Sequence, residues 1–394
     1  MKDKNSENRG MIIRNARVVT PEQVLPGSSV IVEDGVIGKI SSNGTRCQGL
    51  EEIDAGNRLL MPGFIDIHSD AIENAIQPRP GGRFPVDVAL HELDKQLVAC
   101  GVTTIYHCLC FLPPDEQPAF RNAETTDYLV RQIHDLQSGL KARTRVHARY
   151  EITNSANFDD VETLIRKKLI HFFSIMDHTP GQGQFSDVAN FRAYYSKSRG
   201  LTQDQVEEMI EQRLKVGSRV DWERLAKLGR TCSENGVRMA SHDDDSAGKV
   251  EKANRLGVTL SEFPVNLEAA RAARRHGMLI SLGSPNVLRG ASLTGNLSGR
   301  DALNDGLGDI LCSDYAPMSL LHAALHLHKE GLRTLPEAVR LITLHPAKGA
   351  GIDRVVGSIE TGKAADLVLV DDSQKVAKIC KTFVHGREVF SAGS

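Results

Sequence analysis

The sequence lacks the features that mark membrane proteins, disulfide-rich proteins and nucleic-acid binders. No apolar run approaches the roughly 18 residues of a membrane-spanning helix, and the opening MKDKNSENRG has no apolar stretch typical of a secretory signal. The seven cysteines are an odd number without C-x-x-C spacing, so we expect reduced thiols rather than disulfides or a zinc knuckle. The net charge of -2 offers no field that attracts nucleic acid or an anionic membrane.

The composition is that of an ordinary soluble globular protein. Hydrophobic residues make up 40% and charged residues 25% of the 394 residues. A chain of this length suits one large domain plus a smaller one. The sequence has no internal repeat, no low-complexity tract and no G-x-G-x-x-G dinucleotide fingerprint.

Both ends of the chain show the alternation and β-branched residues typical of strands. Asp34-Gly35, within SSVIVEDGVIGKI, is a strong hairpin signal. Neither end has enough apolar residues for a core of its own. We therefore predict one discontinuous β domain made of residues 11–61 and 351–394.

The middle of the chain, residues 62–350, alternates short apolar runs with helical patterns, which indicates βα units and a parallel sheet. About eight such strands predict a (β/α)8 barrel of the α/β class. A doubly wound open sheet is the alternative. Residues 179–222 are polar, and this pattern predicts a loop or a helical lid. The predicted strands are GFIDIH, VTTIYHCL, RVHARYEI, HFFSIMDH, VRMASHDD, VTLSEF, MLISLG and DILCSD.

Five of these strands end in residue types that bind metal ions. The carboxyl ends of barrel strands meet at one mouth, so we expect these side chains to converge. Imidazoles and carboxylates together suit Zn²⁺, Mn²⁺ or Fe²⁺ better than Ca²⁺ or Mg²⁺. One such histidine is commonly a packing residue, but five such strand ends favour a metal site. The residues are His68, Asp70, Glu151, Asp177, His178, His242, Asp243, Asp244, Asp245 and Asp314.

Two of these strand ends allow more than one interpretation. The run from His242 to Asp245 can also be a solvated turn or a helix N-cap, so we expect only one or two of its carboxylates to act. Residues two apart on a strand share a face, so Arg149 points the same way as Glu151. Arg149 then either binds substrate or holds Glu151 in a salt bridge.

Three loops after the predicted strands are rich in hydrogen-bond donors. Residues 282–300 follow the seventh strand, where barrels commonly bind phosphate, and a polar surface loop is the alternative. Glycine lets backbone N–H groups turn toward a ligand, while Arg, Asn and hydroxyl groups donate to oxyanions. The loops together predict a polyanionic substrate. The candidate donors are Arg79, Arg83, Gln182, Asn286, Arg289, Ser292 and Asn296, with Arg149.

The motif PGFIDIHSD resembles the first-strand motif of the amidohydrolase superfamily, PG-x-x-D-x-H-x-H, and the terminal β segments resemble its composite small domain. Within the superfamily, the chain resembles the PhnM family of the carbon–phosphorus lyase pathway. The resemblance runs from about residue 11 to residue 390. It is carried by DIHSDAIENAIQPRPGGRFP, MDHTPGQGQF, SHDDDS, GSPNVLRG and CSDYAP.

This resemblance implies hydrolysis of α-D-ribose 1-methylphosphonate 5-triphosphate to the 5-phosphate and pyrophosphate, with two divalent ions, Zn²⁺ or Mn²⁺. It implies that His68 is the first-strand ligand and that Glu151 bridges two ions. His178 and His242 match the paired strand-end histidines. Asp314 matches a ligand that also accepts the proton of the attacking water. The implied catalytic residues are Glu151, His242 and Asp314.

The chain departs from the family pattern at three places. Asp70 stands where the superfamily has a second histidine, and we expect it to ligate a hard ion such as Mn²⁺ or to orient His68. The family's seventh-strand loop has a histidine where this chain has Leu293, which puts one phosphate donor in doubt. The superfamily places its histidines on the fifth and sixth strands, whereas His178 and His242 end the fourth and fifth predicted strands.

Two alternative functions stay open. One is an amidohydrolase that acts on an amide or cyclic amide, of the deacetylase or deaminase type; the arginine- and glycine-rich loops argue against it, because a neutral amide needs few cations. The other is a non-catalytic homologue, which would typically have lost metal ligands. We expect a small phosphorylated ribosyl substrate, no nucleic-acid or membrane partner, a homodimer and a cytoplasmic location.

Overall fold

The computed structural model describes residues 10–41, 49–79, 81–114, 122–185, 187–199, 201–217, 220–292 and 295–393. These residues form two compact units. The first unit holds the described residues of 10–107, 136–145 and 310–393, and the second those of 108–135 and 146–309. The predicted domain limits at residues 61 and 350 stay a prediction.

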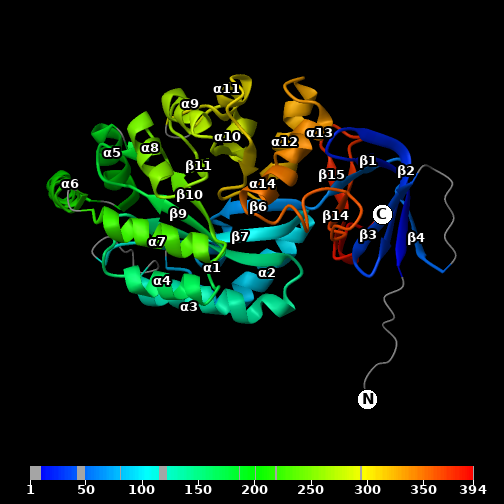
Figure 1. Ribbon diagram of the computed structural model, residues 1–394, viewed down its shortest axis with the longest axis horizontal. Coiled ribbons are helices and arrows are strands. Elements are labelled where there is room, and N and C mark those ends of the chain that lie inside the picture. The colour runs from blue at the N-terminus through cyan, green and yellow to red at the C-terminus, as the bar shows by residue number, and fades with distance from the viewer. Residues whose placement is uncertain are drawn as a thin grey trace, which may run out of the picture. The chain divides into compact units, whose positions relative to one another are not determined.

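One mixed sheet in the first unit combines the two ends of the chain. Its strand order is β16-β15-β14-β5-β1-β2-β3, and β4 pairs with β1. The pairing of β14 with β5 joins the two ends directly, with Leu367 opposite Pro62. Figure 1 shows the blue and red strands side by side. The strands are β1 (Met11–Val19), β2 (Val24–Glu33), β3 (Val36–Ser41), β4 (Glu51–Asp54), β5 (Leu59–Pro62), β14 (Leu367–Asp371), β15 (Lys378–Val384) and β16 (Arg387–Ser391).

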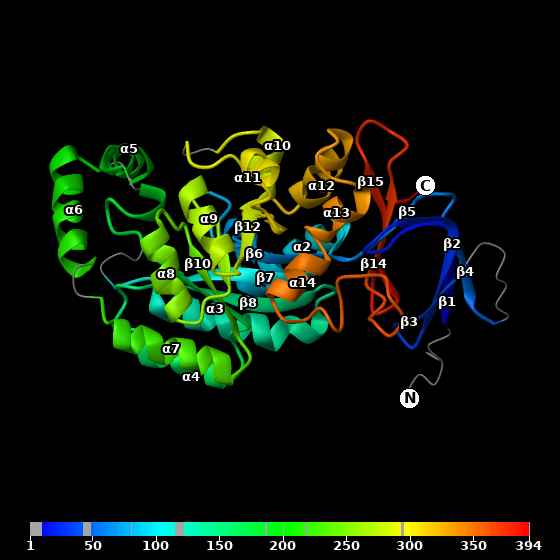
Figure 2. The same cartoon turned by 45° about the horizontal axis from the view of Figure 1, so that its top comes forward.

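The core of this mixed sheet also draws on both ends of the chain. Ile13, Leu60, Leu367 and Phe383 are buried in one hydrophobic cluster, and β14 and β15 lie beside β5 and β1 in Figure 2. The pairing confirms that the ends form one β structure. The predicted hairpin is also confirmed: Asp34 and Gly35 have φ of 52° and 76° between β2 and β3. Left-handed backbone at both central residues suits a tight hairpin turn.

The second sheet contains all eight strands predicted from the middle of the chain. Its order is β13-β12-β11-β10-β9-β8-β7-β6, and the pairings detailed for the described residues are parallel. A parallel bridge between Ser69 and Asp314 joins the two edge strands, so the sheet is a nearly closed barrel and not an open sheet. The strands are β6 (Phe64–Ser69), β7 (Val102–Phe111), β8 (Arg143–Glu151), β9 (Phe172–Met176), β10 (Arg238–His242), β11 (Leu260–Glu262), β12 (Leu279–Gly283) and β13 (Ile310–Cys312).

Helices follow most of the parallel strands, as the alternating pattern predicts. Alanine-rich α9 buries Ala269, Ala270, Ala272 and Ala273, because small residues let it pack closely. The helices are α1 (Ala71–Ile76), α2 (Val86–Ala99), α3 (Ala123–Leu136), α4 (Phe158–Arg166), α5 (Val188–Arg199), α6 (Gln203–Gly217), α7 (Trp222–Glu234), α8 (Ala247–Arg255), α9 (Leu267–Arg275), α10 (Ser284–Arg289), α11 (Gly299–Asn304), α12 (Ser319–Lys329), α13 (Leu335–Arg340) and α14 (Leu344–Gly349).

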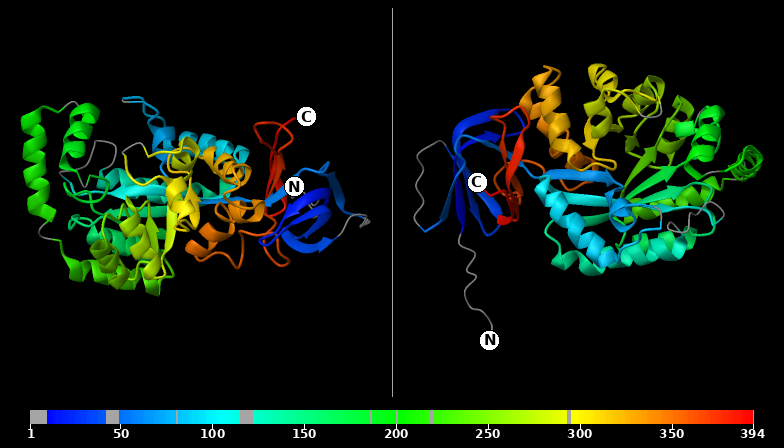
Figure 3. Two further views of the ribbon diagram at one scale, coloured as in Figure 1. Left: turned by 90° about the horizontal axis from the view of Figure 1, so that it is seen from above. Right: turned by 180° about the vertical axis from the view of Figure 1, so that it is seen from behind.

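The polar segment after β9 is helical rather than a bare loop. Helices α5 and α6 lie side by side, as the green pair in Figure 3 shows. They bury a small cluster of their own that contains Phe185, Phe191, Tyr195, Val206 and Ile210. The segment is therefore a packed helical pair inserted before α7.

Candidate metal centre

In the first unit, three predicted ligands lie together at the ends of β6 and β13. One potential ligand atom from each of His68, Asp70 and Asp314 lies within 4.8 Å of the others. Backbone hydrogen bonds set this arrangement: the Asp314 N–H donates to the His68 carbonyl at 3.1 Å, and the Asp70 N–H donates to the Asp314 carbonyl at 2.6 Å. The structure thus brings together residues that are more than 240 positions apart in the sequence.

The local backbone explains how the two aspartates are presented. Asp70 is not part of the strand but the N-cap residue of α1, and its side chain makes no capping hydrogen bond. Asp314 has a φ of 58°, a left-handed conformation that is uncommon for a residue other than glycine. Such strained residues cluster at functional sites, where the surrounding structure holds them.

Asp66 ties the two strands together beneath these ligands. It is fully buried, and its Oδ1 accepts hydrogen bonds from the N–H of Ser313 at 3.1 Å and of His68 at 3.3 Å. Burial raises the pKa of Asp66 to about 6, although these hydrogen bonds oppose the shift. Of the three alternating polar residues after Phe64, Asp66 therefore supports the strand ends, while the other two belong to the ligand group.

In the second unit, Glu151 and His178 form a close pair. Glu151 is buried, and it accepts hydrogen bonds from the His178 N–H at 3.1 Å and the His178 ring Nδ1 at 2.7 Å. Burial by itself lowers the pKa of His178, but the Glu151 carboxylate, together with Asp243, more than offsets this, so the net pKa shift is upward. A carboxylate hydrogen-bonded to an imidazole in this way fixes the orientation of the ring.

His242 lies at the end of β10 between a cation and an anion. The Arg149 guanidinium is 3.0 Å from its Nε2, and Asp243 Oδ2 is 3.1 Å from its Nδ1. Burial raises the pKa of Asp243, but His242, His178 and Arg149 together hold it below its usual value. Asp243 also has a left-handed φ of 55°. Arg149, predicted beside Glu151, thus lies against a histidine of the same group.

Of the three aspartates after His242, Asp243 is the one whose carboxylate contacts the His242 ring. Asp244 is buried and accepts hydrogen bonds from the hydroxyls of Ser241 and Ser261, each at 2.6 Å, so it holds β10 to β11. Asp245 receives the Gly183 N–H and lies 3.3 Å from Lys249 Nζ. Both are structural, which leaves Asp243 as the carboxylate beside His242.

The predicted phosphate donors fall into both units. Arg79 and Arg83 are exposed in the loop after α1, where the Gly82 N–H donates to the Arg79 carbonyl. In the second unit, Asn286 holds its loop together, because its Nδ2 donates to the Leu297 carbonyl and its Oδ1 accepts from the Gly299 N–H, both at 3.0 Å. Asn286 is therefore a loop-holding residue in this structure.

The remaining donors lie near the same elements. Gln182 lines a small cavity of about 90 Å³ together with His242, Asp177 and Lys249. Arg289 is exposed near the end of α10, and Ser292 and Asn296 are half-buried in the loop that follows. Leu293 lies outside the described residues. That all the predicted residues belong to one active site stays a prediction.

Sequence reasoning missed one residue of this region, Glu262, and named Asp243 only as one of three equivalent aspartates. Glu262, fully buried at the end of β11, was seen only as part of a strand. A charged residue that ends an apolar strand is the signal that could have identified Glu262.

The donor types in both units fit a divalent metal ion. Imidazole with carboxylates suits Zn²⁺, Mn²⁺ or Fe²⁺. The left-handed Asp314, buried His68 and the paired Glu151 and His178 are the kind of fixed ligands that an ion requires. The donor chemistry in each unit therefore agrees with the predicted cofactor class.

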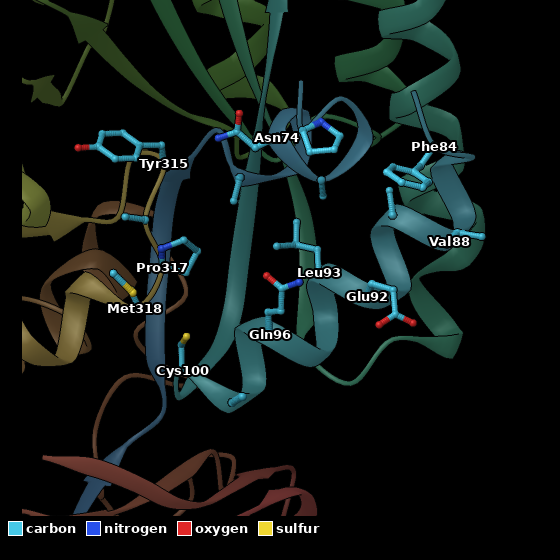
Figure 4. Close-up of a pocket in the computed structure, with 16 residues that line it drawn as sticks. Asn74, Phe84, Val88, Glu92, Leu93, Gln96, Cys100, Tyr315, Pro317 and Met318 are labelled. Carbon is cyan, nitrogen blue, oxygen red and sulfur yellow. The ribbon is translucent and has the colours of Figure 1, made fainter. Parts of the chain in front are cut away.

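An apolar groove of about 790 Å³ lies beside the first ligand group. Figure 4 shows its walls, α1, α2 and the start of the segment after β13, with Phe84, Val88, Tyr315 and Met318 exposed around it. Among the described residues, its lining includes Glu92 and no arginine or lysine, so this surface is mostly apolar.

Comparisons with known proteins agree with this architecture. The Amidohydrolase family matches residues 203–389. The α-D-ribose 1-methylphosphonate 5-triphosphate diphosphatase of Escherichia coli (strain K12) is 33% identical, over 96% of this chain and 100% of that protein. The dihydroorotase of Aquifex aeolicus (strain VF5) is 22% identical, over 93% of this chain and 90% of its own.

A solved structure shows the same fold. The N-acetylglucosamine-6-phosphate deacetylase from Pasteurella multocida superposes with a TM-score of 0.62 at 14% identity, over 96% of this chain and 99% of that one. Among the described residues, no helix is both long and apolar enough to span a membrane. The full-length match at 33% identity places the chain in the amidohydrolase superfamily, in the family of α-D-ribose 1-methylphosphonate 5-triphosphate diphosphatases.

Proposed function

We propose that this protein hydrolyses α-D-ribose 1-methylphosphonate 5-triphosphate to the 5-phosphate and pyrophosphate, a step of phosphonate catabolism in the carbon–phosphorus lyase pathway. The observation that carries the proposal is the 33% identity to the Escherichia coli diphosphatase along the full length of both chains. Water adds to phosphorus, the anhydride bond between the α- and β-phosphates breaks, and pyrophosphate leaves.

The predicted ligand residues would hold two divalent ions, Zn²⁺ or Mn²⁺, with Glu151 as the shared carboxylate. Bound ions of this kind lower the pKa of a coordinated water and polarise a phosphoryl oxygen. The close group of His68, Asp70 and Asp314 and the Glu151–His178 pair support this proposal. The metal-binding residues are His68, Asp70, Glu151, His178, His242 and Asp314.

The chain's own groups would then move the proton and stabilise charge. Asp314, held in its left-handed conformation, accepts the proton of the attacking water. The His242 ring is held by Arg149 at its Nε2 and by Asp243 at its Nδ1. Cations and donors around the site offset the charge of the departing pyrophosphate. These are Arg79, Arg83, Arg149, Gln182, Asn286, Arg289, Ser292 and Asn296.

The decisive experiment supplies the purified protein with a ribosyl 5-triphosphate and with a panel of N-acyl amino acids, and measures pyrophosphate release and deacylation. We expect pyrophosphate from the triphosphate only. Chelator treatment should abolish the release, and added Mn²⁺ or Zn²⁺ should restore it. Deacylation without pyrophosphate release would replace this proposal by the amidohydrolase alternative.

We also propose a homodimer in the cytoplasm. The six cysteines that the structure describes are thiols, which fits a reducing compartment. Light scattering coupled to size-exclusion chromatography measures the assembly, and a mass near that of one 394-residue chain would refute the dimer.

A further inference from the structure

Lys249, in the first turn of α8, reaches two carboxylates that follow neighbouring barrel strands in the second unit. Its Nζ lies 3.5 Å from Asp177 Oδ2, after β9, and donates to Asp245 Oδ2, after β10, at 3.3 Å. The lysine side chain is only 17% exposed, and the two aspartates are 18% and 12% exposed. A cation in the first turn of a helix meets the positive end of the helix dipole. The two carboxylates, rather than the helix, therefore account for the position of this ammonium group.

The same two carboxylates hold the turn of residues 178–185, which follows β9. Asp245 Oδ2 accepts a hydrogen bond from the Gly183 N–H, and Asp177 Oδ1 accepts one from the Thr179 N–H at 3.1 Å. Gly183 has a φ of 57°, and a Cβ there would lie 3.1 Å from the carbonyl oxygen of Asp177. The turn is therefore packed closely against the end of β9, and the carboxylates that hold it share one ammonium group.

This turn begins with His178, a predicted metal ligand, and contains Gln182, a predicted donor to the substrate. His178 is held separately, because both its N–H and its ring Nδ1 are hydrogen-bonded to the Glu151 carboxylate. Gln182 lies farther along the turn, where its N–H donates to the Thr179 carbonyl at 3.0 Å, and it lines the same small cavity as Lys249. Loss of the Lys249 charge should thus disturb Gln182 and spare His178.

Burial makes this group of charges sensitive to the loss of its cation. An exposed ion pair contributes little to stability, whereas removal of one partner from a buried pair leaves an uncompensated charge at a large cost. Without the ammonium group that both contact, Asp177 and Asp245 would repel each other. The turn that they hold would then lose its fixed position.

We propose that Lys249 is a positioning residue for substrate binding. Its ammonium group holds the two aspartates together and so fixes the turn 178–185, which presents Gln182 to the phosphates of the substrate. This inference rests on the proposed function, to which the role of Gln182 as a donor belongs. It assigns a role to a residue of α8 for which the strand-end motifs gave no indication.

Lys252 is a matched control on the same helix. It lines the same cavity as Lys249 but is exposed, and its Nζ lies over the Trp222 ring, 5.4 Å from the ring centroid. Lys252→Met therefore removes the same charge from the same helix and leaves the Lys249 ion pairs in place.

The first measurement is hydrogen exchange of the full-length protein without substrate, read in peptides that cover the turn 178–185. We expect Lys249→Met to speed exchange there by about tenfold, and Lys252→Met to exchange like the parent. Lys249→Arg keeps the charge and should also stay near the parent. Circular dichroism confirms that each variant is folded. Parent-like exchange in Lys249→Met would overturn the proposal.

The second measurement is the steady-state hydrolysis of the ribosyl 5-triphosphate. Lys249→Met should raise KM by about tenfold and change kcat by less than about twofold, because the binding of the phosphates is disturbed while the predicted metal ligands are not. A role in the general stability of the fold would not separate these two constants. A fall in kcat with unchanged KM, or no change in either constant, would refute the positioning role.

If Lys249→Met does not fold, Lys249→Gln provides the same test with a polar side chain. The exchange measurement needs no substrate. A parent that releases no pyrophosphate therefore refutes only the proposed function, and exchange still tests whether Lys249 holds the turn. Turnover by the parent together with parent-like exchange in Lys249→Met refutes only this inference.

Discussion

At the scale of single residues, we propose that Asp70 sets which ions the first ligand group prefers. A carboxylate at this position prefers hard ions, whereas imidazole favours Zn²⁺. We predict that Asp70→His raises the ratio of bound Zn²⁺ to bound Mn²⁺ by about tenfold. Elemental analysis after incubation with equal concentrations of both ions measures this ratio.

The control for this substitution is Asp87→His, which places an imidazole on an exposed position of α2 in the same unit. It should leave the metal ratio of the parent unchanged. If Asp70→His keeps both the parent's metal content and its turnover, Asp70 is neither a ligand nor a support for His68.

His107 on β7 predicts a pH dependence of stability. The residue is fully buried, neither ring nitrogen has a hydrogen-bond partner among the described residues, and burial lowers its pKa to about 4. Between pH 6.5 and 4 the unfolded chain takes up a proton that the folded protein does not. Acid therefore lowers the free energy of unfolding, by about 3 kcal/mol over this range.

We expect His107→Phe to remove this part of the pH dependence. Urea unfolding of the variant and the parent at several pH values isolates His107, because the other histidines titrate in both proteins. The same substitution at exposed His134 on α3 should leave the dependence intact. Equal pH dependence in His107→Phe and the parent would contradict the assignment.

At the scale of elements, one glycine sets how closely α7 approaches the end of α8. A Cβ at Gly229 would lie 2.4 Å from the Leu256 carbonyl oxygen, which belongs to the backbone. Alanine usually stabilises a helix interior relative to glycine, but here the two backbones would have to separate. We predict that Gly229→Ala lowers the free energy of unfolding by about 2 kcal/mol.

Gly248 in α8 is the matched control, because a Cβ there meets nothing within 4 Å. Gly248→Ala should raise the free energy of unfolding by about 0.5–1 kcal/mol. Chemical denaturation of both variants gives the comparison. Stabilisation by Gly229→Ala would mean that the helices are not held at this distance.

The elements of the parallel sheet could be predicted because each follows from a local pattern. All eight strands were identified; His178 follows the fourth of them and His242 is the last residue of the fifth. The sixth strand ends in Glu262 instead. What the local pattern could not reveal is which polar side chains bond across strands, such as Ser174 on β9 to Glu262 on β11, because the register between strands is a tertiary property.

At the scale of the whole molecule, the mixed sheet depends on contacts between the two ends of the chain. Leu367 on β14 is fully buried in the cluster that includes Leu60 of β5. We predict that Leu367→Ala lowers the free energy of unfolding by about 3 kcal/mol, through lost burial and the cavity left behind. Urea unfolding followed by circular dichroism measures the change.

Val376→Ala, at a position that is 59% exposed, is the control and should change stability little. If Leu367→Ala unfolds like the parent, then the packing of the two ends contributes little to stability, and the discontinuous β structure would have to be held by its backbone pairing alone.

The sequence by itself determined which chemistry is available: the barrel class, the residue types at the strand ends, and the family motifs. The barrel class and the strand-end residue types follow from periodicity and composition within short segments, and the motifs identify the family by resemblance. Only the tertiary structure decided which members of a run face a ligand group, such as Asp243 rather than Asp244, and which buried groups hold them. That choice depends on the register, the backbone conformation and the burial that neighbouring strands impose on one another, and no single segment contains this information.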